Sequence, residues 1–496
     1  MGKVEVECDF LVIGSGPGGA LMARRLAETG KKVVVVEAGP RVGPKDFVRE
    51  AGTTLAKYFW EAGLRTTMGG NVIMPTLQPK VLGGGSVFNS AICIRMPEFA
   101  LKRWQKDHGV TVTQDEMERH FEAVESFMGV RQTRPEVQGR RNELFAEACD
   151  KVGISWEAID RNEDGCRGSG ECLTGCPNHG KLSMDRRGVP EILSLGGDVY
   201  TCVNIEKLVI KDGRVTGATG WITEPVTNKR GVDVRIVARD AVVLSAGALS
   251  SPVIALRSGL TQAPIGGNLR FHPSTAMMGM FDEEVHPWSG AAQGMHSLQY
   301  LEQGIKLESL WAAGSLLSFR LPGVGTDFQQ LLADQKYMAC WDAWASGEDS
   351  VGRVRLAPAT QSPLISYTVG DGDMNRLKTA MIKLSEMYFA VGAKRVLHGV
   401  NSMKPAFENV GEIDLLRNMT MSPRTMLVGS NHVFGGMSMG SDPKRHAVDN
   451  RGAVYGVRDL YVADTGMFPS SPAVNPMLTA MAFADRFGQQ IGERYA

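Results

Sequence analysis

Three of the eight cysteines of this chain lie close together in one glycine-rich segment. They stand at Cys166, Cys172 and Cys176 in the pattern Cys-x5-Cys-x3-Cys, and Pro177 follows the last of them. Thiolates bind soft metals, and a proline directly after a ligand cysteine also occurs in bacterial ferredoxins. The pattern suits a three-iron cluster, a zinc site with His179 as fourth ligand, or a loop of structural or disulfide-paired thiols. The residues alone leave these interpretations open.

A histidine and an asparagine near the end of the chain are the second candidates for chemistry. His432 precedes a glycine-rich loop, and Asn475 stands directly before Pro476 at the start of a long apolar segment. Imidazole titrates near neutral pH and can act as a general base. Asparagine followed by proline is also an ordinary helix start, and a single histidine is often structural. By themselves these residues permit both interpretations.

Three glycines near the N-terminus have the spacing of a dinucleotide-binding turn. Gly14, Gly16 and Gly19 form the pattern Gly-x-Gly-x-x-Gly, and Glu37 follows further along the chain. The first glycine makes the turn, the second lets the backbone approach a pyrophosphate, and the third lets a helix pack on a strand. An acidic residue in the place of Glu37 can bind ribose hydroxyls. We therefore predict dinucleotide binding here.

The segments around these glycines form a strand–helix–strand unit. Phe10–Ile13 is a short apolar run, Ala20–Glu28 has helical spacing, and Val33–Val36 has the composition of a buried parallel strand. The helix would direct the positive end of its dipole at the phosphates.

Later segments of the chain also have the composition of strands and helices. We expect strands at 199–209 and 215–222, and a buried strand from Asp240 that ends in small residues before a helix to Ser258. Such a junction is where a doubly wound sheet receives its ligand. Lys102–Met128 has the spacing of one amphipathic helix. The region from about 273 to 425 lacks dinucleotide signals, so we assign it to substrate binding and part of a β-rich cap.

The overall composition excludes some classes of partner. The 496 residues include 54 basic and 54 acidic side chains, and this balance argues against a nucleic-acid partner. No apolar run is long enough for a transmembrane helix. The first expected strand starts near Val4, which leaves no room for a signal peptide, so we expect a cytoplasmic protein. The alternative is export together with a signal-bearing partner subunit.

Taken together, these motifs resemble the glucose–methanol–choline (GMC) family of flavin-dependent alcohol oxidoreductases. The resemblance runs from end to end of the chain. Its motifs are Gly14-x-Gly16-x-x-Gly19 with Glu37, Gly83-Gly84-Gly85-Ser86 with Asn89 and Arg95, the stretches 245–259 and 265–273, His432-x-x-Gly with Met439-Gly440, Tyr455-Gly-Val, Val462-Ala-Asp464, and Asn475-Pro476.

The resemblance implies roles for these residues. His432 would be the base that takes the hydroxyl proton of an alcohol, with Asn475 as its partner, while flavin N5 takes the hydride. The remaining residues would hold FAD: Gly84, Ser86 and Asn89 along the flavin, Val203 by the adenine, Asp464 near the flavin chain, and Pro476 at a helix start whose positive end faces reduced flavin. Relatives with covalent flavin often have histidine where this chain has Phe88, so we expect non-covalent FAD.

The cysteine segment also resembles that of sugar dehydrogenases in this family, which hold a three-iron cluster. The implied cofactor is therefore a [3Fe-4S] cluster on Cys166, Cys172 and Cys176, passing electrons to an acceptor protein or quinone. Long-chain alcohol oxidases of the family have a related segment. Two alternatives thus remain, an oxidase that reduces oxygen with a structural cysteine loop, and a non-redox lyase or decarboxylase.

The resemblance implies a mixed α/β and α+β fold with two domains. A discontinuous Rossmann-like FAD-binding domain would comprise 1–100, 190–270 and 430–496. A substrate-binding domain, built on an antiparallel sheet and helices, would comprise 101–189 and 271–429, with the cysteine-rich loop at 165–181. The region 273–425 is rich in Met and Trp and poor in obvious sugar-binding carboxylate clusters, which slightly favours an apolar or aromatic alcohol as substrate.

Overall fold

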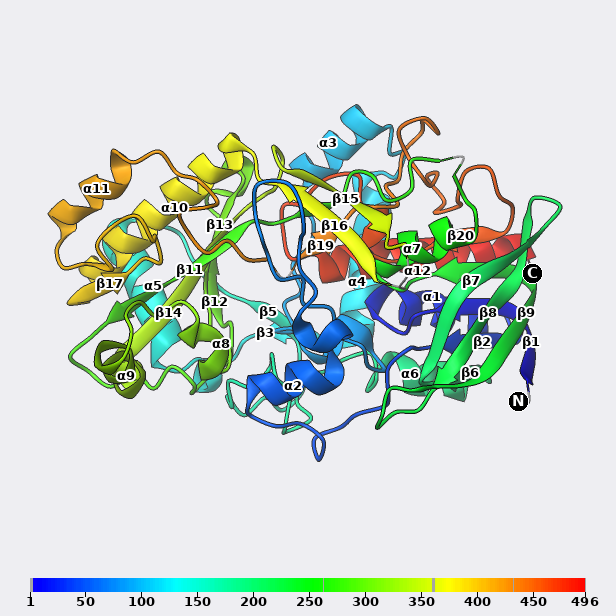
Figure 1. Ribbon diagram of the computed structural model, residues 1–496, viewed down its shortest axis with the longest axis horizontal. Helices are drawn as coiled ribbons and strands as arrows, with labels where there is room; N and C mark the ends of the chain where they lie inside the picture. Colours follow the sequence, from blue (N-terminus) through cyan, green and yellow to red (C-terminus); the bar gives the residue numbers. More distant parts are fainter. Residues whose placement is uncertain (1–2, 262, 359–361, 431, 496) are drawn as a thin grey trace.

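The computed structural model describes residues 3–261, 263–358, 362–430 and 432–495. Two large sheets lie at opposite ends of the molecule, and both chain termini lie at the end formed by the first sheet (Figure 1). The fold class expected from the sequence is confirmed. The domain limits given above stay a prediction.

The first sheet has seven strands in the order β6-β2-β1-β9-β8-β7, and β20 pairs with β9 beside that path. The pairs among β6, β2, β1, β9 and β20 are parallel, whereas β7 and β8 run antiparallel to their neighbours. The strands are β1 (Lys3–Ile13), β2 (Val33–Val36), β6 (Asp198–Tyr200), β7 (Val203–Lys211), β8 (Arg214–Thr223), β9 (Arg230–Leu244) and β20 (Leu460–Val462).

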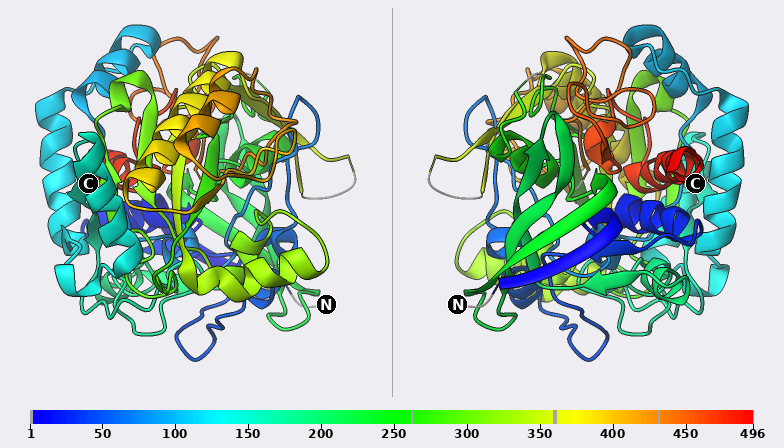
Figure 2. Two further views of the ribbon diagram at one scale, coloured as in Figure 1. Left: turned by 90° about the vertical axis from the view of Figure 1, so that its left-hand side faces the viewer. Right: turned by 90° about the vertical axis from the view of Figure 1, so that its right-hand side faces the viewer.

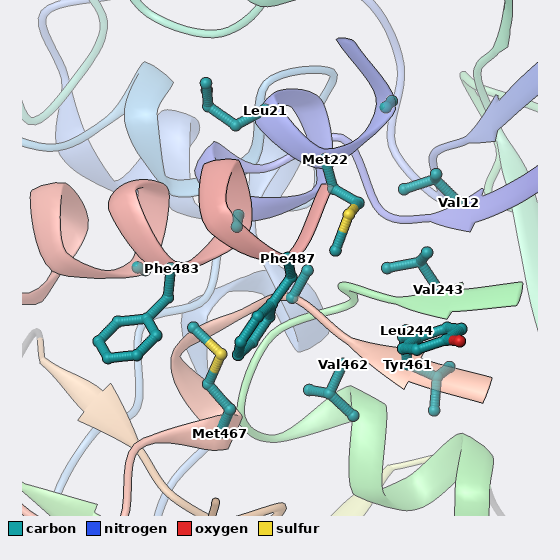
Figure 3. Close-up of a cluster of buried hydrophobic side chains, with 14 of the residues drawn as sticks. Val12, Leu21, Met22, Val243, Leu244, Tyr461, Val462, Met467, Phe483 and Phe487 are labelled. Carbon is teal, nitrogen blue, oxygen red and sulfur yellow. The ribbon is translucent and has the colours of Figure 1, made fainter. Parts of the chain in front are cut away.

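Three helices pack beside one another next to this sheet. Helix α1 (Pro17–Ala27) lies against α12 (Pro476–Tyr495), and α12 lies against α4 (Gln114–Met128), as the right-hand view of Figure 2 shows. The core between these helices and the sheet is apolar: Met22, Val243, Val462 and Phe487 are at most 1% exposed (Figure 3). The burial of this core fixes the starts of α1 and α12 relative to the ends of the parallel strands.

The second sheet has seven antiparallel strands in the order β18-β17-β11-β14-β13-β12-β4. Its strands are β4 (Glu157–Ala158), β11 (Ser274–Met280), β12 (Met295–Ser297), β13 (Ile305–Ser309), β14 (Met338–Ala345), β17 (Arg395–Leu397) and β18 (Ala406–Phe407). Helix α10 (Asp371–Ala390) packs on β11, β13 and β14, and α5 (Arg140–Val152) packs on α10 and on β12 and β14. Every residue of β13 and β14 is buried.

Smaller elements connect the two sheets. The helices are α2 (Ala51–Tyr58), α3 (Glu98–His108), α6 (Gly188–Ser194), α7 (Ser250–Arg257), α8 (Gly314–Ser318), α9 (Thr326–Ala333) and α11 (Ile413–Arg417). Three two-stranded pairs complete the fold: β3 (Val130–Gln132) with β5 (Asp160–Asn162), β10 (Arg270–Phe271) with β19 (Val433–Phe434), and β15 (Val351–Leu356) with β16 (Pro363–Thr368).

The expectation of one helix over Lys102–Met128 is wrong. Helix α3 ends before Gly109, which adopts a left-handed conformation with φ of 66°. The chain then runs extended to Thr113, whose side chain caps α4 by accepting a hydrogen bond from the Glu116 N–H. Glycine tolerates this conformation and threonine is a common N-cap, so the two residues end one helix and begin another. Within the described residues, no helix is both long and apolar enough to cross a membrane.

Candidate active site

The glycine turn after β1 has the geometry that its spacing predicts. Gly14 has a φ of 106°, and a Cβ there would lie 2.2 Å from the carbonyl oxygen of Ser245. A Cβ on Gly19 would lie 2.1 Å from the oxygen of Gly14, so α1 packs directly on the turn. A Cβ on Gly16, in contrast, would meet nothing within 4 Å. The middle glycine therefore faces open space.

The start of α1 fits a phosphate group. Gly16 is the N-cap, no side chain caps the helix, and the first turn contains no acidic residue. The N–H groups of the first turn of a helix have no intrahelical partner, and the positive end of the dipole favours an anion. These uncapped groups, beside the open space over Gly16, are what a dinucleotide pyrophosphate requires.

Glu37 follows β2 and lies at the same edge of the sheet. Its carboxylate accepts hydrogen bonds from the N–H and Oγ of Ser15, at 3.1 and 2.7 Å, and from the N–H of Gly39 at 2.9 Å. Burial raises its pKa, and these hydrogen bonds oppose the shift. The N–H of Val203 donates to the Glu37 carbonyl at 2.8 Å. Glu37 and Val203 are therefore neighbours, and their contact with a ribose and an adenine stays a prediction.

The segment 84–89 lies between the starts of α1 and α12. A Cβ on Gly84 would lie 2.9 Å from the Cα of Gly16, so the two backbones are in contact. Ser86 Oγ donates to the Gly83 carbonyl at 2.7 Å and accepts from the Met184 N–H at 2.9 Å. The amide nitrogen of Asn89 lies 3.0 Å from the sulfur of Met477 in the first turn of α12. The segment thus connects the glycine turn after β1 to the start of α12.

Phe88 and Asp464 flank this region. The Phe88 ring packs against the rings of Phe47, Tyr58 and Phe59. Asp464 is buried, which raises its pKa, and its carboxylate accepts hydrogen bonds from the N–H of Gly247, the hydroxyl of Ser251 and the N–H of Gly466. The carboxylate therefore fixes local backbone, and the contact of Asp464 with a flavin chain stays a prediction.

His432 and Asn475 are in contact. The Asn475 Nδ2 and the His432 Nε2 lie 3.2 Å apart, and the other ring nitrogen of His432 lies 3.0 Å from Nδ1 of His272. His272 Nε2 lies 2.8 Å from the hydroxyl of Ser471. The structure brings His432 and Asn475 together, and their roles as base and partner stay a prediction. Asn475 stands directly before α12, so the pair lies at the positive end of that helix.

Lys306 and Glu308 of β13 lie beside this pair, although no sequence motif includes them. Lys306 Nζ donates to the Asn475 Oδ1 at 2.8 Å and to a Glu308 carboxylate oxygen at 2.5 Å. The Lys306 side chain is fully buried, and that of Glu308 is 3% exposed. The only signal in the sequence is the alternation Lys306-Leu307-Glu308, and on a strand such alternation more often marks a solvent-facing side.

The electrostatics keep both histidines neutral. Burial lowers the pKa of His432 to about 4, with Glu308 opposing and Lys306 supporting the shift. Burial also lowers the pKa of His272 well below its usual value. Because Lys306 donates to Asn475 Oδ1, the Asn475 nitrogen must point at His432 and donate to its Nε2. Nε2 is then the unprotonated nitrogen, and the ring proton lies on Nδ1 toward His272.

The three clustered cysteines line one small cavity. The Arg161 guanidinium donates to the sulfurs of Cys172 and Cys166, at 3.4 and 3.7 Å. Lys181 Nζ donates to the carbonyls of Cys172 and Asn89, at 2.9 and 2.7 Å, and so ties this loop to the segment 84–89.

The geometry of this cavity does not fit a metal cluster. Although the donor set suits a soft metal, no three histidine, cysteine or acidic residues of the described ranges are placed to share one ion. A guanidinium lies against two of the three sulfurs. All eight cysteines are unpaired, so the disulfide alternative is not formed.

Comparisons with family models and with individual proteins point to the same family. Two family models described as GMC oxidoreductase match the chain, one over residues 15–274 and the other over 348–484. An uncharacterised GMC-type oxidoreductase of Mycobacterium tuberculosis strain H37Rv is 30% identical over 482 residues, which cover 96% of this chain and 74% of the relative.

Other similar proteins have named activities. A long-chain-alcohol oxidase of Arabidopsis thaliana is 24% identical over 529 residues, which cover 99% of this chain and 67% of that protein. Among solved structures, a formate oxidase variant of Aspergillus oryzae superimposes with a TM-score of 0.76 at 15% identity and covers 99% of both chains. At this identity the structural likeness bears on the fold alone.

Proposed function

The chain belongs to the GMC oxidoreductase family, and on that premise we propose that it binds FAD non-covalently and oxidises an alcohol to an aldehyde or ketone. The observation that carries the proposal is the His432–Asn475 pair at the start of α12. A neutral imidazole nitrogen and an amide donor lie there side by side, next to the segment 84–89 that contacts the phosphate-binding turn.

FAD is implied by the family, and the residues present fit it. Gly16, the uncapped start of α1, Gly84 and Asn89 would hold the dinucleotide, and Phe88 offers no nitrogen for a covalent link. When bound, FAD supplies the acceptor for the hydride of the alcohol carbon.

His432 removes the proton in the proposed reaction. The O–H bond of the alcohol breaks, its proton goes to Nε2 of His432, and the C–H electrons leave with the hydride as the C=O bond forms. The pKa of about 4 keeps Nε2 unprotonated at neutral pH. The Asn475 Nδ2 donates to the developing alkoxide, which its hydrogen bond to His432 already positions it to do.

Two neighbouring residues, Lys306 and His272, orient this pair. Lys306 fixes the Asn475 amide through Oδ1, and His272 accepts the Nδ1 proton of His432 as a hydrogen bond. Because these partners leave one tautomer and one amide orientation, the substrate meets an organised acceptor and donor. The start of α12 would add positive potential, which favours negative charge on a cofactor bound there.

We further propose molecular oxygen as the electron acceptor. A long-chain-alcohol oxidase is among the similar proteins, and the cysteine cavity does not fit a cluster. The two electrons taken from the alcohol, with two protons, reduce oxygen to hydrogen peroxide. The competing interpretation is a dehydrogenase whose cysteine loop carries electrons to a protein or quinone.

Anaerobic mixing of the holoenzyme with alcohols tests the proposal. We expect the flavin absorbance near 450 nm to bleach on addition of an alcohol, and readmitted oxygen to restore it with one peroxide per flavin. A flavin that stays oxidised during turnover would favour a lyase or decarboxylase. Bleaching with slow reoxidation by oxygen, together with iron and labile sulfide in anaerobically purified protein, would favour the dehydrogenase.

A further inference from the structure

One face of the second sheet carries a row of polar side chains. Directly paired residues of antiparallel strands point to the same face. His296 of β12 is paired on one side with Glu157 of β4 and on the other with Glu308 of β13. Glu308 is in turn paired with Asp342 of β14. These four residues, which we call the polar row, come from four distant parts of the chain, so no cluster is visible in the sequence.

A second pair on the same face extends the row. Lys306 and Trp344 are paired with each other, and each lies two residues from a member of the row on its own strand. Lys306 bonds Asn475, and the Trp344 ring lies 5.9 Å from the ring of His432 in a T-shaped arrangement. The polar face is therefore adjacent to the proposed base.

Among the described residues of this face, three buried polar atoms have no hydrogen-bond partner. One is Nδ1 of His296, and the two nearest to Lys306 and Glu308 are Oδ1 of Asp342, a residue 9% exposed, and Nε1 of Trp344, which is 2% exposed. A buried donor or acceptor left unpaired costs free energy. The neighbouring Lys306 and Glu308 satisfy each other. The unpaired Asp342 oxygen and Trp344 N–H both lie on β14, the strand next to the one that carries Lys306 and Glu308.

The other end of the row reaches a cavity. Glu157 and His296 line a cavity of about 440 Å³, and they are hydrogen-bonded to each other at 3.0 Å. The walls of the cavity also include Arg95 and Asp160. The row thus leads from this cavity toward the His432–Asn475 pair: Glu157 bonds His296 at one end, Lys306 bonds Glu308 and Asn475 at the other, and strand pairing places His296 beside Glu308.

We propose that Asp342 and Trp344, with Lys306 and Glu308, form a recognition subsite for an alcohol that carries further hydroxyl groups. The proposal rests on the proposed function and names its substrate class as a polyol rather than a long-chain or aromatic alcohol. A hydroxyl both donates and accepts, so it satisfies the Asp342 oxygen and the Trp344 N–H together. An alkyl chain would leave both atoms unpaired, and sites of this kind reject analogues that lack the hydroxyl.

The charges on this face favour a neutral ligand. Lys306 and Glu308 balance each other at 2.5 Å. Burial and the nearby Glu308 raise the pKa of Asp342 well above its usual value, while Lys306 and Arg320 oppose the shift. Among Lys306, Glu308, Asp342 and Trp344, no excess charge therefore calls for an ammonium or carboxylate on the substrate.

A pair of six-carbon alcohols tests the subsite. D-Sorbitol and 1-hexanol share chain length and differ in hydroxyls, and each is mixed anaerobically with the holoenzyme. We expect sorbitol to reduce the flavin with a second-order rate constant at least about 100-fold above that of 1-hexanol. Trp344→Phe keeps an aromatic ring but removes the indole N–H, and should lower the sorbitol constant by about 10-fold more than it lowers the 1-hexanol constant.

Two matched controls and a binding readout complete the test. Trp288→Phe and Asp282→Asn change exposed residues outside the row and should leave both constants unchanged. Asp342→Asn keeps the size of the side chain and should also lower the sorbitol constant. Sorbitol should perturb the flavin spectrum of the His432→Ala holoenzyme, and Trp344→Phe added to it should weaken this binding.

The outcomes separate the two proposals. A preference for 1-hexanol, or equal losses for both alcohols in Trp344→Phe, would overturn the subsite and leave alcohol oxidation standing. If no alcohol bleaches the flavin, the proposed function fails. In that case the sorbitol difference spectrum still decides the subsite, since binding that Trp344→Phe weakens supports it and absence of binding overturns it.

Discussion

At the scale of single residues, the proposed chemistry depends on which nitrogen of His432 is free. The Asn475 amide faces Nε2, and its orientation follows from the hydrogen bond that Lys306 donates to Oδ1. His272 accepts a hydrogen bond from the Nδ1–H of His432, which carries the only N–H proton of that neutral ring. A buried lysine thus determines the tautomer of a histidine that it does not touch.

This arrangement predicts a pH profile and its dependence on Lys306. The rate of flavin reduction by an alcohol should be constant through neutral pH and fall only as pH drops toward about 4, where His432 becomes protonated. Lys306→Met removes a cation that lowers the pKa of His432 and leaves Glu308 unbalanced, and both changes raise that pKa. The acid limb should therefore move to higher pH, by at least about one pH unit.

The conservative variant is the control for this prediction. Lys306→Arg keeps the positive charge beside Glu308 and Asn475, so its acid limb should stay close to that of the wild type. Stopped-flow rates of anaerobic flavin reduction between pH 4 and 9 measure the limb in all three proteins. An identical limb in Lys306→Met and wild type would show that Lys306 does not act on His432.

Sequence motifs identified His432 and Asn475 but not the residues that orient them. Glycine loops and the asparagine–proline start of a helix are local patterns, visible within a few residues. Lys306, Glu308, Asp342 and Trp344 reach the site only through the pairing of β13 with β14. Long-range register of this kind depends on tertiary packing, and single positions in alternating strands carry no sign of it.

At the scale of elements, the turn between β1 and α1 is the part of the site with the sharpest geometric test. A side chain on Gly14 or Gly19 would overlap backbone atoms within 2.2 Å, whereas one on Gly16 would point into open space. Gly16 has a φ of −63°, which alanine adopts without strain. The protein can therefore accept alanine there, but a dinucleotide at this turn cannot approach as closely.

Gly16→Ala should weaken FAD binding without weakening the fold. We expect the apoprotein to unfold at the temperature of wild-type apoprotein, and the affinity for FAD to fall by about tenfold or more, roughly 1.4 kcal/mol. Thermal unfolding of apoprotein and titration with FAD measure the two effects. Gly43→Ala, where an added Cβ also meets nothing within 4 Å, should change neither. Normal FAD affinity in Gly16→Ala would remove this turn from the binding site.

The sequence predicted helices and strands correctly where a segment had one uninterrupted residue pattern. Val33–Val36 is an unbroken β-branched run and forms β2 over the predicted residues. The helix predicted after Asn475 begins at Pro476 as α12. The predicted helix over Lys102–Met128 failed because Gly109 and Thr113 interrupt a pattern whose apolar spacing continues on both sides. The apolar spacing continues from α3 into α4, so it does not reveal where one helix ends and the next begins. The capping residues set that boundary.

At the scale of the whole molecule, the candidate site is built from both sheets. The glycine turn follows β1 of the first sheet, Asn475 precedes α12, which packs beside that sheet, and His432 precedes β19, whereas Lys306, Glu308 and Trp344 come from the second sheet. The cysteine loop is tied to the segment 84–89 through Lys181, which bonds the carbonyls of Cys172 and Asn89. Residues far apart in the chain thus meet around one place, where the family implies FAD.

The way FAD is held predicts a simple property of the whole protein. Phe88 packs in an aromatic cluster with Phe47, Tyr58 and Phe59 and carries no nucleophilic atom, so no histidyl link to flavin can form at that position. Acid precipitation of the holoprotein should release its yellow colour into the supernatant. Flavin that stays with the washed precipitate would show a covalent link to another residue.

The most direct test of the central claim compares His432→Ala with wild type in a single anaerobic turnover. Both proteins are loaded with FAD, and equal flavin content is verified before an alcohol that reduces the wild type is added. Removal of a general base costs roughly 10²–10⁴-fold in rate, so the variant should keep its flavin and bleach slower by that factor. Near-normal bleaching in His432→Ala would contradict the account, because the proton of the alcohol would then leave without this residue.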